Sequence, residues 1–237
     1  MIRVLGPVDA TIGFNSIPIG GPKQRMVLSL IAAGAGRVVT RDALVLNLYG
    51  ESSRDASHRV VHTYVSNLRR VLGDSISSAH NGYFFRAGPY LLDSLEFDRL
   101  VRESVERGPQ DPGAAFDGLS RALGLFRGDP YSGFEDVEAL RPEIVRLVEH
   151  RVHAQVERAR AGIACGQASG VIAELRSLRV EHPYREDIVE FLMTALRSVG
   201  MAAEAIHEYS RLRRVLATDI GVEPTPHLQA FAAEISL

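Results

Sequence analysis

The sequence predicts an α+β region over residues 1–95 followed by an all-α region over residues 96–237. Three observations support this fold class. In the first region, short apolar runs bounded by glycine or proline flank segments of helical periodicity. After Leu95, only segments of helical periodicity remain. The charge also divides at this point, because residues 1–95 hold 10 Lys/Arg and 6 Asp/Glu, whereas residues 96–237 hold 17 and 23. A basic first region favours an anionic partner.

The first half of the α+β region contains strand signals and then two helix signals. The runs IRVLG, VDATIG and SIPIGG predict short strands, with a turn at residues 13–15 between the last two. From Pro22 the apolar period becomes helical, and proline suits a first helical turn. Thr40 predicts the N-cap of a second helix, which ends at Gly50.

The second half of this region adds a third helix and a hairpin. Asp55 and Ser57 are candidate caps for the helix, which ends at Gly73. The pair Asn81-Gly82 lies between aromatic and apolar runs, which is a strong hairpin signal. A capped second helix, a loop, a third helix and a hairpin together predict a winged helix-turn-helix. In that fold the third helix enters the major groove of DNA.

The all-α region is predicted to consist of stacked helical hairpins, because long amphipathic segments alternate with short Gly/Pro turns. Residues 195–216 also carry the small and aromatic positions that are typical of tetratricopeptide-like packing. Asp111-Pro112 supplies a cap and a first-turn proline for the second of these helices. The helical segments lie at residues 95–108, 111–126, 138–165, 169–183, 185–200, 201–221 and 225–236. We expect the boundary between the two domains at residues 95–96.

The third helix has two different faces at 100° per residue. The apolar face holds Val60, Val61, Tyr64, Val65, Leu68, Val71 and Leu72. The polar face holds His58, Arg59, His62, Thr63, Ser66, Arg69 and Arg70, with Asn67 at its border. No carboxylate on this face can pair with the arginines at i,i+4 spacing, so they are available for phosphate or base contacts. A solvated surface helix remains the alternative on this pattern alone.

The sequence gives no sign of catalysis, a cofactor or a metal site. The segment IGGPKQR lacks the GxxxxGK[ST] spacing of a phosphate-binding loop. The histidine pairs His58/His62 and His150/His153 have no evident third ligand. Cys165 is the only cysteine and can form neither an intrachain disulfide nor a cysteine-based zinc site. Without a secretory signal or an apolar run of about 20 residues, we expect a cytoplasmic protein that does not enter the membrane.

Four segments of the first region carry a family resemblance: RVLGPVDA, residues 17–50, VVHTYVSNLRRVLG and NGYFF. In this order they resemble the OmpR-type winged-helix domain of the Streptomyces antibiotic regulatory protein (SARP) family. ALGLFRGDPYSGFED, residues 181–216 and DIGVEPTPHLQAF similarly resemble the family's bacterial transcriptional activation domain. The resemblance covers nearly the whole chain.

This resemblance implies a sequence-specific activator of transcription. Family members typically bind tandem direct repeats of double-stranded promoter DNA and recruit RNA polymerase holoenzyme, here for a cluster of secondary-metabolite (antibiotic) genes. The protein would work in the nucleoid as a homodimer, at least on DNA. Two alternatives remain: a tetratricopeptide-like protein-interaction module with accessory DNA affinity, and a response-regulator output domain.

The resemblance also assigns roles to individual residues. Thr63, Ser66, Asn67 and Arg70 would face the groove or read bases, and Arg59, His62 and Arg69 would contact phosphates. Asn81, Gly82 and Tyr83 would form the wing, Arg86 would reach the minor groove, and Lys23 and Thr40 would hold phosphates near helix starts. Asn67 occupies a position where relatives often carry arginine, and asparagine favours adenine where arginine favours guanine. Tyr49 replaces the usual tryptophan, which implies a change in packing.

Overall fold

A computed structural model describes residues 1–13, 15–50, 55–86 and 92–235, without the side chains of residues 55–57. The chain forms two compact units, and each is described separately. The first contains Met1–Leu100 and Ala122–His150, and the second contains Val101–Arg121 and Arg151–Leu237. Residues 122–150, from the all-α region, therefore belong to the first unit. The domain boundary at residues 95–96 stays a prediction.

The first unit begins with a small antiparallel sheet in the order β1-β2-β3. Its strands are β1 (Ile2–Arg3), β2 (Asp9–Ile12) and β3 (Asn15–Ile17). Ala10 faces Ile2 on one side and Ile17 on the other. The prediction of three short strands is confirmed, although β3 begins at Asn15, one residue before the predicted run and inside the predicted turn.

Three helices follow: α1 (Pro22–Ala33), α2 (Arg41–Tyr49) and α3 (Asp55–Leu72). Thr40 caps α2 as predicted, because its Oγ1 accepts the backbone N–H of Ala43 at 3.1 Å. Gly50 ends this helix with a positive φ of 69°. As a correction to the predicted caps, α3 already includes Asp55 and Ser57, so neither precedes the helix as an N-cap does. The residue before α3 lies outside the described part of the chain.

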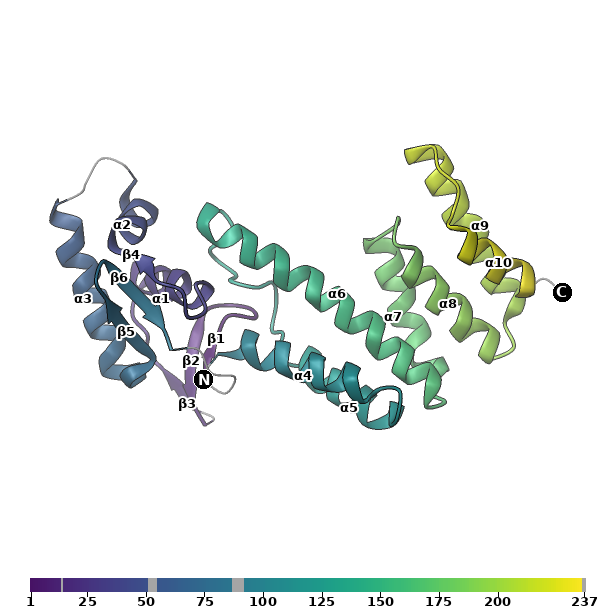
Figure 1. The fold of residues 1–237 in the computed structure, drawn as a ribbon, viewed down its shortest axis with the longest axis horizontal. Coiled ribbons are helices and arrows are strands. Elements are labelled where there is room, and N and C mark those ends of the chain that lie inside the picture. The colour runs from purple at the N-terminus through teal and green to yellow at the C-terminus, as the bar shows by residue number, and fades with distance from the viewer. Residues whose placement is uncertain (14, 51–54, 87–91, 236–237) are drawn as a thin grey trace. The chain divides into compact units, whose positions relative to one another are not determined.

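The predicted hairpin is formed by β5 (Ile76–Ala79) and β6 (Gly82–Phe85), preceded by the 3-10 turn η1 (Gly73–Ser75). It lies beside α3 in Figure 1. The two residues between the strands are His80 and Asn81, one position earlier than the predicted Asn81-Gly82 turn. Gly82 is instead a strand residue, because β6 also pairs with β4 (Val39–Thr40). The two-residue β4 was not predicted, since nothing local distinguishes it from the loop around it.

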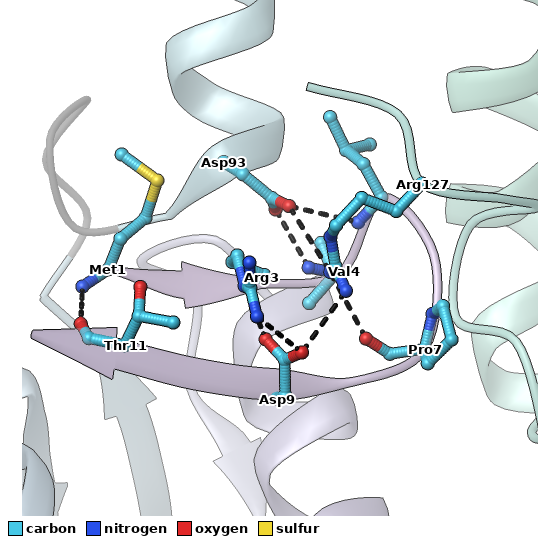
Figure 2. A network of polar contacts seen from close by, with 9 residues as sticks. Met1, Arg3, Val4, Pro7, Asp9, Thr11, Asp93 and Arg127 are labelled. Carbon is cyan, nitrogen blue, oxygen red and sulfur yellow. Dashed lines mark hydrogen bonds and ion pairs between the residues drawn. The ribbon is translucent and has the colours of Figure 1, made fainter. Parts of the chain in front are cut away.

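The segment at residues 127–132 packs along the N-terminus of the first unit. The backbone N–H groups of Arg127, Tyr131 and Ser132 donate to the carbonyls of Leu5, Val4 and Gly6 at 2.8, 2.7 and 3.1 Å. The buried carboxylate of Asp93 accepts the N–H groups of Val4 and Leu5 at 2.8 and 3.1 Å (Figure 2). One N-terminal segment is therefore held by two parts of the chain that are distant in sequence.

A second carboxylate extends these contacts, and Figure 2 shows how they converge. Asp9 accepts hydrogen bonds from Arg3 at 2.5 and 2.7 Å and from Arg127 at 3.1 Å. Arg127 also donates to the carbonyl of Pro7 at 3.1 Å and lies 4.0 Å from Asp93. This polar cluster ties residues 3–9 to the 127–132 segment.

The second unit is helical, as predicted, and helices α4, α5 and α6 contribute residues to both units. The elements after residue 92 are α4 (Asp93–Arg107), α5 (Pro112–Leu123), η2 (Glu138–Leu140), α6 (Arg141–Ala164), α7 (Ala168–Glu181), α8 (Glu186–Ser198), α9 (Ala202–Val215), the π-helical turn η3 (Leu216–Ile220) and α10 (Pro226–Ile235). Helix α8 packs against α7 and α9, and its apolar face lies in the core of the unit. No helix within the described residues has the length and apolar character needed to cross a membrane.

Candidate nucleic-acid interface

Helix α3 buries one face and exposes the other, as its two-faced sequence pattern predicted. Val61, Val65 and Leu68 are at most 1% exposed, and they pack on the side where α3 meets α1 and α2. The exposed residues among the predicted contacts are Arg59, His62, Thr63 and Arg70, and the partly exposed ones are Ser66, Asn67 and Arg69. Helix α3 thus presents a continuous polar surface.

Two polar residues of α3 are held by neighbouring helices. The Nδ2 group of Asn67 donates to Gln24 Oε1 of α1 at 3.4 Å, which orients the amide. His58 Nε2 lies 2.9 Å from the carboxylate of Asp42 in α2. The sequence pattern missed this carboxylate because it comes from another helix.

Arg59 and Arg70 differ from the other arginines that the structure describes in the first region. Both side chains are exposed. Among the described residues, neither has a hydrogen bond, an ion pair or a ring contact to its guanidinium. Arg70 also lies in the last turn of α3. Two cations on one helix, each without an intramolecular partner, are suited to bind phosphate or base edges.

Arg69 points to the wing instead, where wing denotes the β5–β6 hairpin, residues 76–85. Its Nε donates to the carbonyl of Ile76 at 2.9 Å, and its Nη2 donates to Ser78 Oγ at 2.9 Å. The prediction of a phosphate contact did not foresee these bonds, because they join α3 to a later hairpin. The structure gives Arg69 an intramolecular role.

The three predicted wing residues and Arg86, which directly follows the wing, lie in different environments. Asn81 is at the exposed tip, where its carbonyl accepts the N–H of Arg41 at 3.0 Å. Arg86 is also exposed and donates to Ser77 Oγ at 2.7 Å. Gly82 and Tyr83 are buried, and Tyr83 is only 2% exposed. Gly82 and Tyr83 pack the wing onto the domain and leave little surface for a ligand. This burial corrects the prediction that these two residues contact DNA.

Lys23 and Thr40 lie at the starts of α1 and α2, as expected. The ammonium of Lys23 lies 4.0 Å from the ring centroid of Tyr49, within range of a cation–π interaction. Tyr49 in turn hydrogen-bonds Tyr64, and this bond together with burial raises the pKa of the Tyr64 hydroxyl. Tyr49, which replaces the usual tryptophan of relatives, thus links α2 to both α1 and α3.

The histidines and acidic residues do not assemble a metal site within the described ranges. His150 Nδ1 lies 2.8 Å from the carboxylate of Asp98. Burial raises the pKa of Asp98, but the bonds from His150 and Arg146 outweigh burial, so the net pKa is lowered. This pair is a polar contact between α4 and α6.

Two family models match the chain. Residues 19–83 match "Transcriptional regulatory protein, C terminal". Residues 92–236 match "Bacterial transcriptional activator domain". Together they cover helices α1 to α3, the wing as far as Tyr83 and almost the whole of the second region.

Three curated relatives are similar over nearly all of this chain. "Transcriptional regulatory protein EmbR" of Mycobacterium tuberculosis is 35% identical, over 98% of this chain and 62% of the relative. "Transcriptional regulatory protein MoaR1" of M. tuberculosis is 33% identical, over 98% of this chain and 78% of the relative. "Regulatory protein DnrI" of Streptomyces peucetius is 30% identical, over 96% of this chain and 89% of the relative. The chain therefore spans less than two thirds of the length of EmbR.

A solved structure has the same fold. "Mycobacterium tuberculosis EmbR in complex with low affinity phosphopeptide" superposes with a TM-score of 0.90 at 34% identity. The match covers 99% of this chain and 64% of that one. With both domain types, their order and relatives of this similarity, the chain belongs to the SARP family of transcriptional regulators, which combines an OmpR-type winged helix with a bacterial transcriptional activator domain.

Proposed function

We propose that this protein binds double-stranded promoter DNA sequence-specifically, with α3 in the major groove, and activates transcription. The observation that carries the proposal is the exposed polar face of α3, on which Arg59 and Arg70 have no intramolecular partner among the described residues. The winged helix-turn-helix arrangement places such a helix in the groove. The regulatory names of the relatives support the same role.

The proposed contacts divide by chemistry. Thr63, Ser66, Asn67 and Arg70 face the groove floor, and Arg59 and His62 face the phosphates beside it. Asn81 at the tip of the wing and Arg86 directly after it are exposed and can reach the neighbouring backbone or minor groove. Lys23 and Thr40 complete the set, since backbone amides at helix starts attract phosphate.

We further propose that two copies bind adjacent direct repeats. Repeats about 10–11 bp apart would place both copies on the same face of the duplex. The helical second region would then contact the second copy or RNA polymerase holoenzyme. Its excess of acidic over basic residues is unfavourable for a main DNA surface. We propose secondary-metabolite genes as the regulated class.

Replacing Arg59 by alanine is expected to weaken binding to every duplex, because a phosphate contact carries no sequence information. The slope of log K against log salt concentration should fall by about 0.9 for the lost contact. Titration of labelled duplex at several salt concentrations measures both effects. Arg211→Ala is the matched control, since Arg211 is exposed on α9 in the second unit. Equal affinities and slopes for wild type and Arg59→Ala would contradict this contact.

Replacing Asn67 by alanine is expected to change sequence preference at one base position. Loss of a bidentate amide–adenine contact costs about 1–3 kcal/mol of discrimination at that position. Selection of bound duplexes from a random library, with wild type and variant in parallel, measures this directly. Enrichment of a tandem repeat by the wild type supports the proposed function. If no duplex is retained at any salt concentration, the protein-interaction alternative is favoured.

A further inference from the structure

The wing is held by contacts from three separate elements of the first unit. From α3, Arg69 donates to the carbonyl of Ile76 and to Ser78 Oγ, both at 2.9 Å. From α2, the first backbone N–H, that of Arg41, donates to the carbonyl of Asn81 at 3.0 Å. The third element is β4, which pairs with β6. These contacts reach both strands and the tip of the wing.

The ring of Tyr83 connects these contacts. The guanidinium carbons of Arg41 and Arg69 each lie 5.8 Å from its centroid, within cation–π range. Tyr83 is 2% exposed, so these interactions are largely shielded from water. The start of α2, the last turn of α3 and the wing therefore meet around one aromatic side chain.

A hairpin of two four-residue strands needs such support. An isolated two-stranded hairpin is at best marginally stable in water, and β4 adds only two residues to it. Arg69 is suited to this task because its planar guanidinium presents several donors in a fixed geometry. Here Nε bonds the first residue of β5 and Nη2 bonds the third.

We propose that Arg69 is a positioning residue for DNA recognition, whose guanidinium fixes the angle between α3 and the wing before DNA is bound. This inference rests on the proposed function. A wing that is already ordered lowers the conformational cost of binding. Arg69 therefore differs in role from Arg70, its neighbour in sequence, which is exposed and is proposed to contact DNA directly.

The test uses the full chain with Arg69→Ala, Arg69→Lys and Arg70→Ala. Hydrogen exchange of the free proteins reports on wing amides at residues 76–79 and 82–85. Arg69→Ala should accelerate exchange there severalfold and leave the α1 amides unchanged, whereas Arg70→Ala should leave the wing as in wild type. Lysine keeps the charge but lacks the planar fork, so Arg69→Lys should not restore wing protection.

Duplex titrations supply the second readout. Arg69→Ala should lower affinity by about fivefold to tenfold at every salt concentration with an unchanged salt slope, because the wing still reaches DNA after it is ordered. A slope reduced by about one, rescue by lysine and unchanged wing exchange would overturn the proposal and make Arg69 a phosphate contact. A wild-type protein that binds no duplex would overturn the proposed function itself. The exchange measurements would still decide separately whether Arg69 holds the wing.

Discussion

Replacing Asp93 by alanine is expected to destabilise the protein by about 3–5 kcal/mol. Asp93 is 1% exposed and accepts the backbone N–H groups of Val4 and Leu5. Alanine would leave both donors buried without an acceptor, at a cost of about 1–3 kcal/mol each. Arg127 would also lose a carboxylate at 4.0 Å. Urea unfolding followed by circular dichroism measures the loss.

The effect of this substitution should depend on pH. Burial raises the pKa of Asp93 to about 6, and the N–H groups of Val4 and Leu5 and the charge of Arg127 only partly offset burial. The Asp93 carboxyl therefore holds its proton more tightly in the folded protein than in the unfolded chain. The stabilisation that comes from this protonation is present in acid and is lost as the pH rises through 6. The difference between wild type and Asp93→Ala should thus be larger at pH 5 than at pH 8.

Two comparisons make this result specific to Asp93. Asp98, whose net pKa is lowered, has the opposite pH dependence, but it is present in both proteins and cancels in the difference. Asp136→Ala removes an exposed carboxylate of the same unit and should change stability by less than about 0.5 kcal/mol. A loss that is the same at pH 5 and pH 8 would contradict the assigned titration, and a loss below 1 kcal/mol would contradict the buried role.

Replacing Gly82 by alanine is expected to destabilise the first unit by about 2–4 kcal/mol. A Cβ at this position would lie 2.2 Å from the carbonyl oxygen of Val39 and 2.9 Å from Cα of Thr40. Both atoms belong to the backbone of β4, so the strand must move away from β6, and overpacking of this kind commonly costs 1–3 kcal/mol or more. The movement would also disturb Thr40 as the cap of α2.

The same chemical change at Gly170 is the matched control. Gly170 lies in α7, and a Cβ added there would meet open space, so alanine should stabilise the helix by about 0.5–1 kcal/mol. Thermal unfolding of both variants, with wing hydrogen exchange, separates the two effects. A Gly82→Ala protein with wild-type stability and wing protection would show that β4 and β6 can separate at no cost, against this prediction.

The sequence alone determined the order of the longer elements, without the two-residue β4, and the two-faced character of α3. These features depend on signals within a few residues of one another: Pro22 in a first turn, Thr40 three residues before the N–H that it caps, and the apolar period that buries Val61, Val65 and Leu68. The order and spacing of such segments also carried the family resemblance. The residue-level DNA contacts drawn from it remain predictions.

Only the tertiary structure decided which polar groups form hydrogen bonds and ion pairs within the protein. Asp93 binds a backbone amide 89 positions earlier, and Arg127 reaches Asp9 across 118 positions. Arg69 and Gly82 have their roles because a hairpin returns to α3 and β4, which no local pattern records. The physical reason is that a side chain's partner is set by packing between distant segments, whereas capping and periodicity are set by neighbours along the chain.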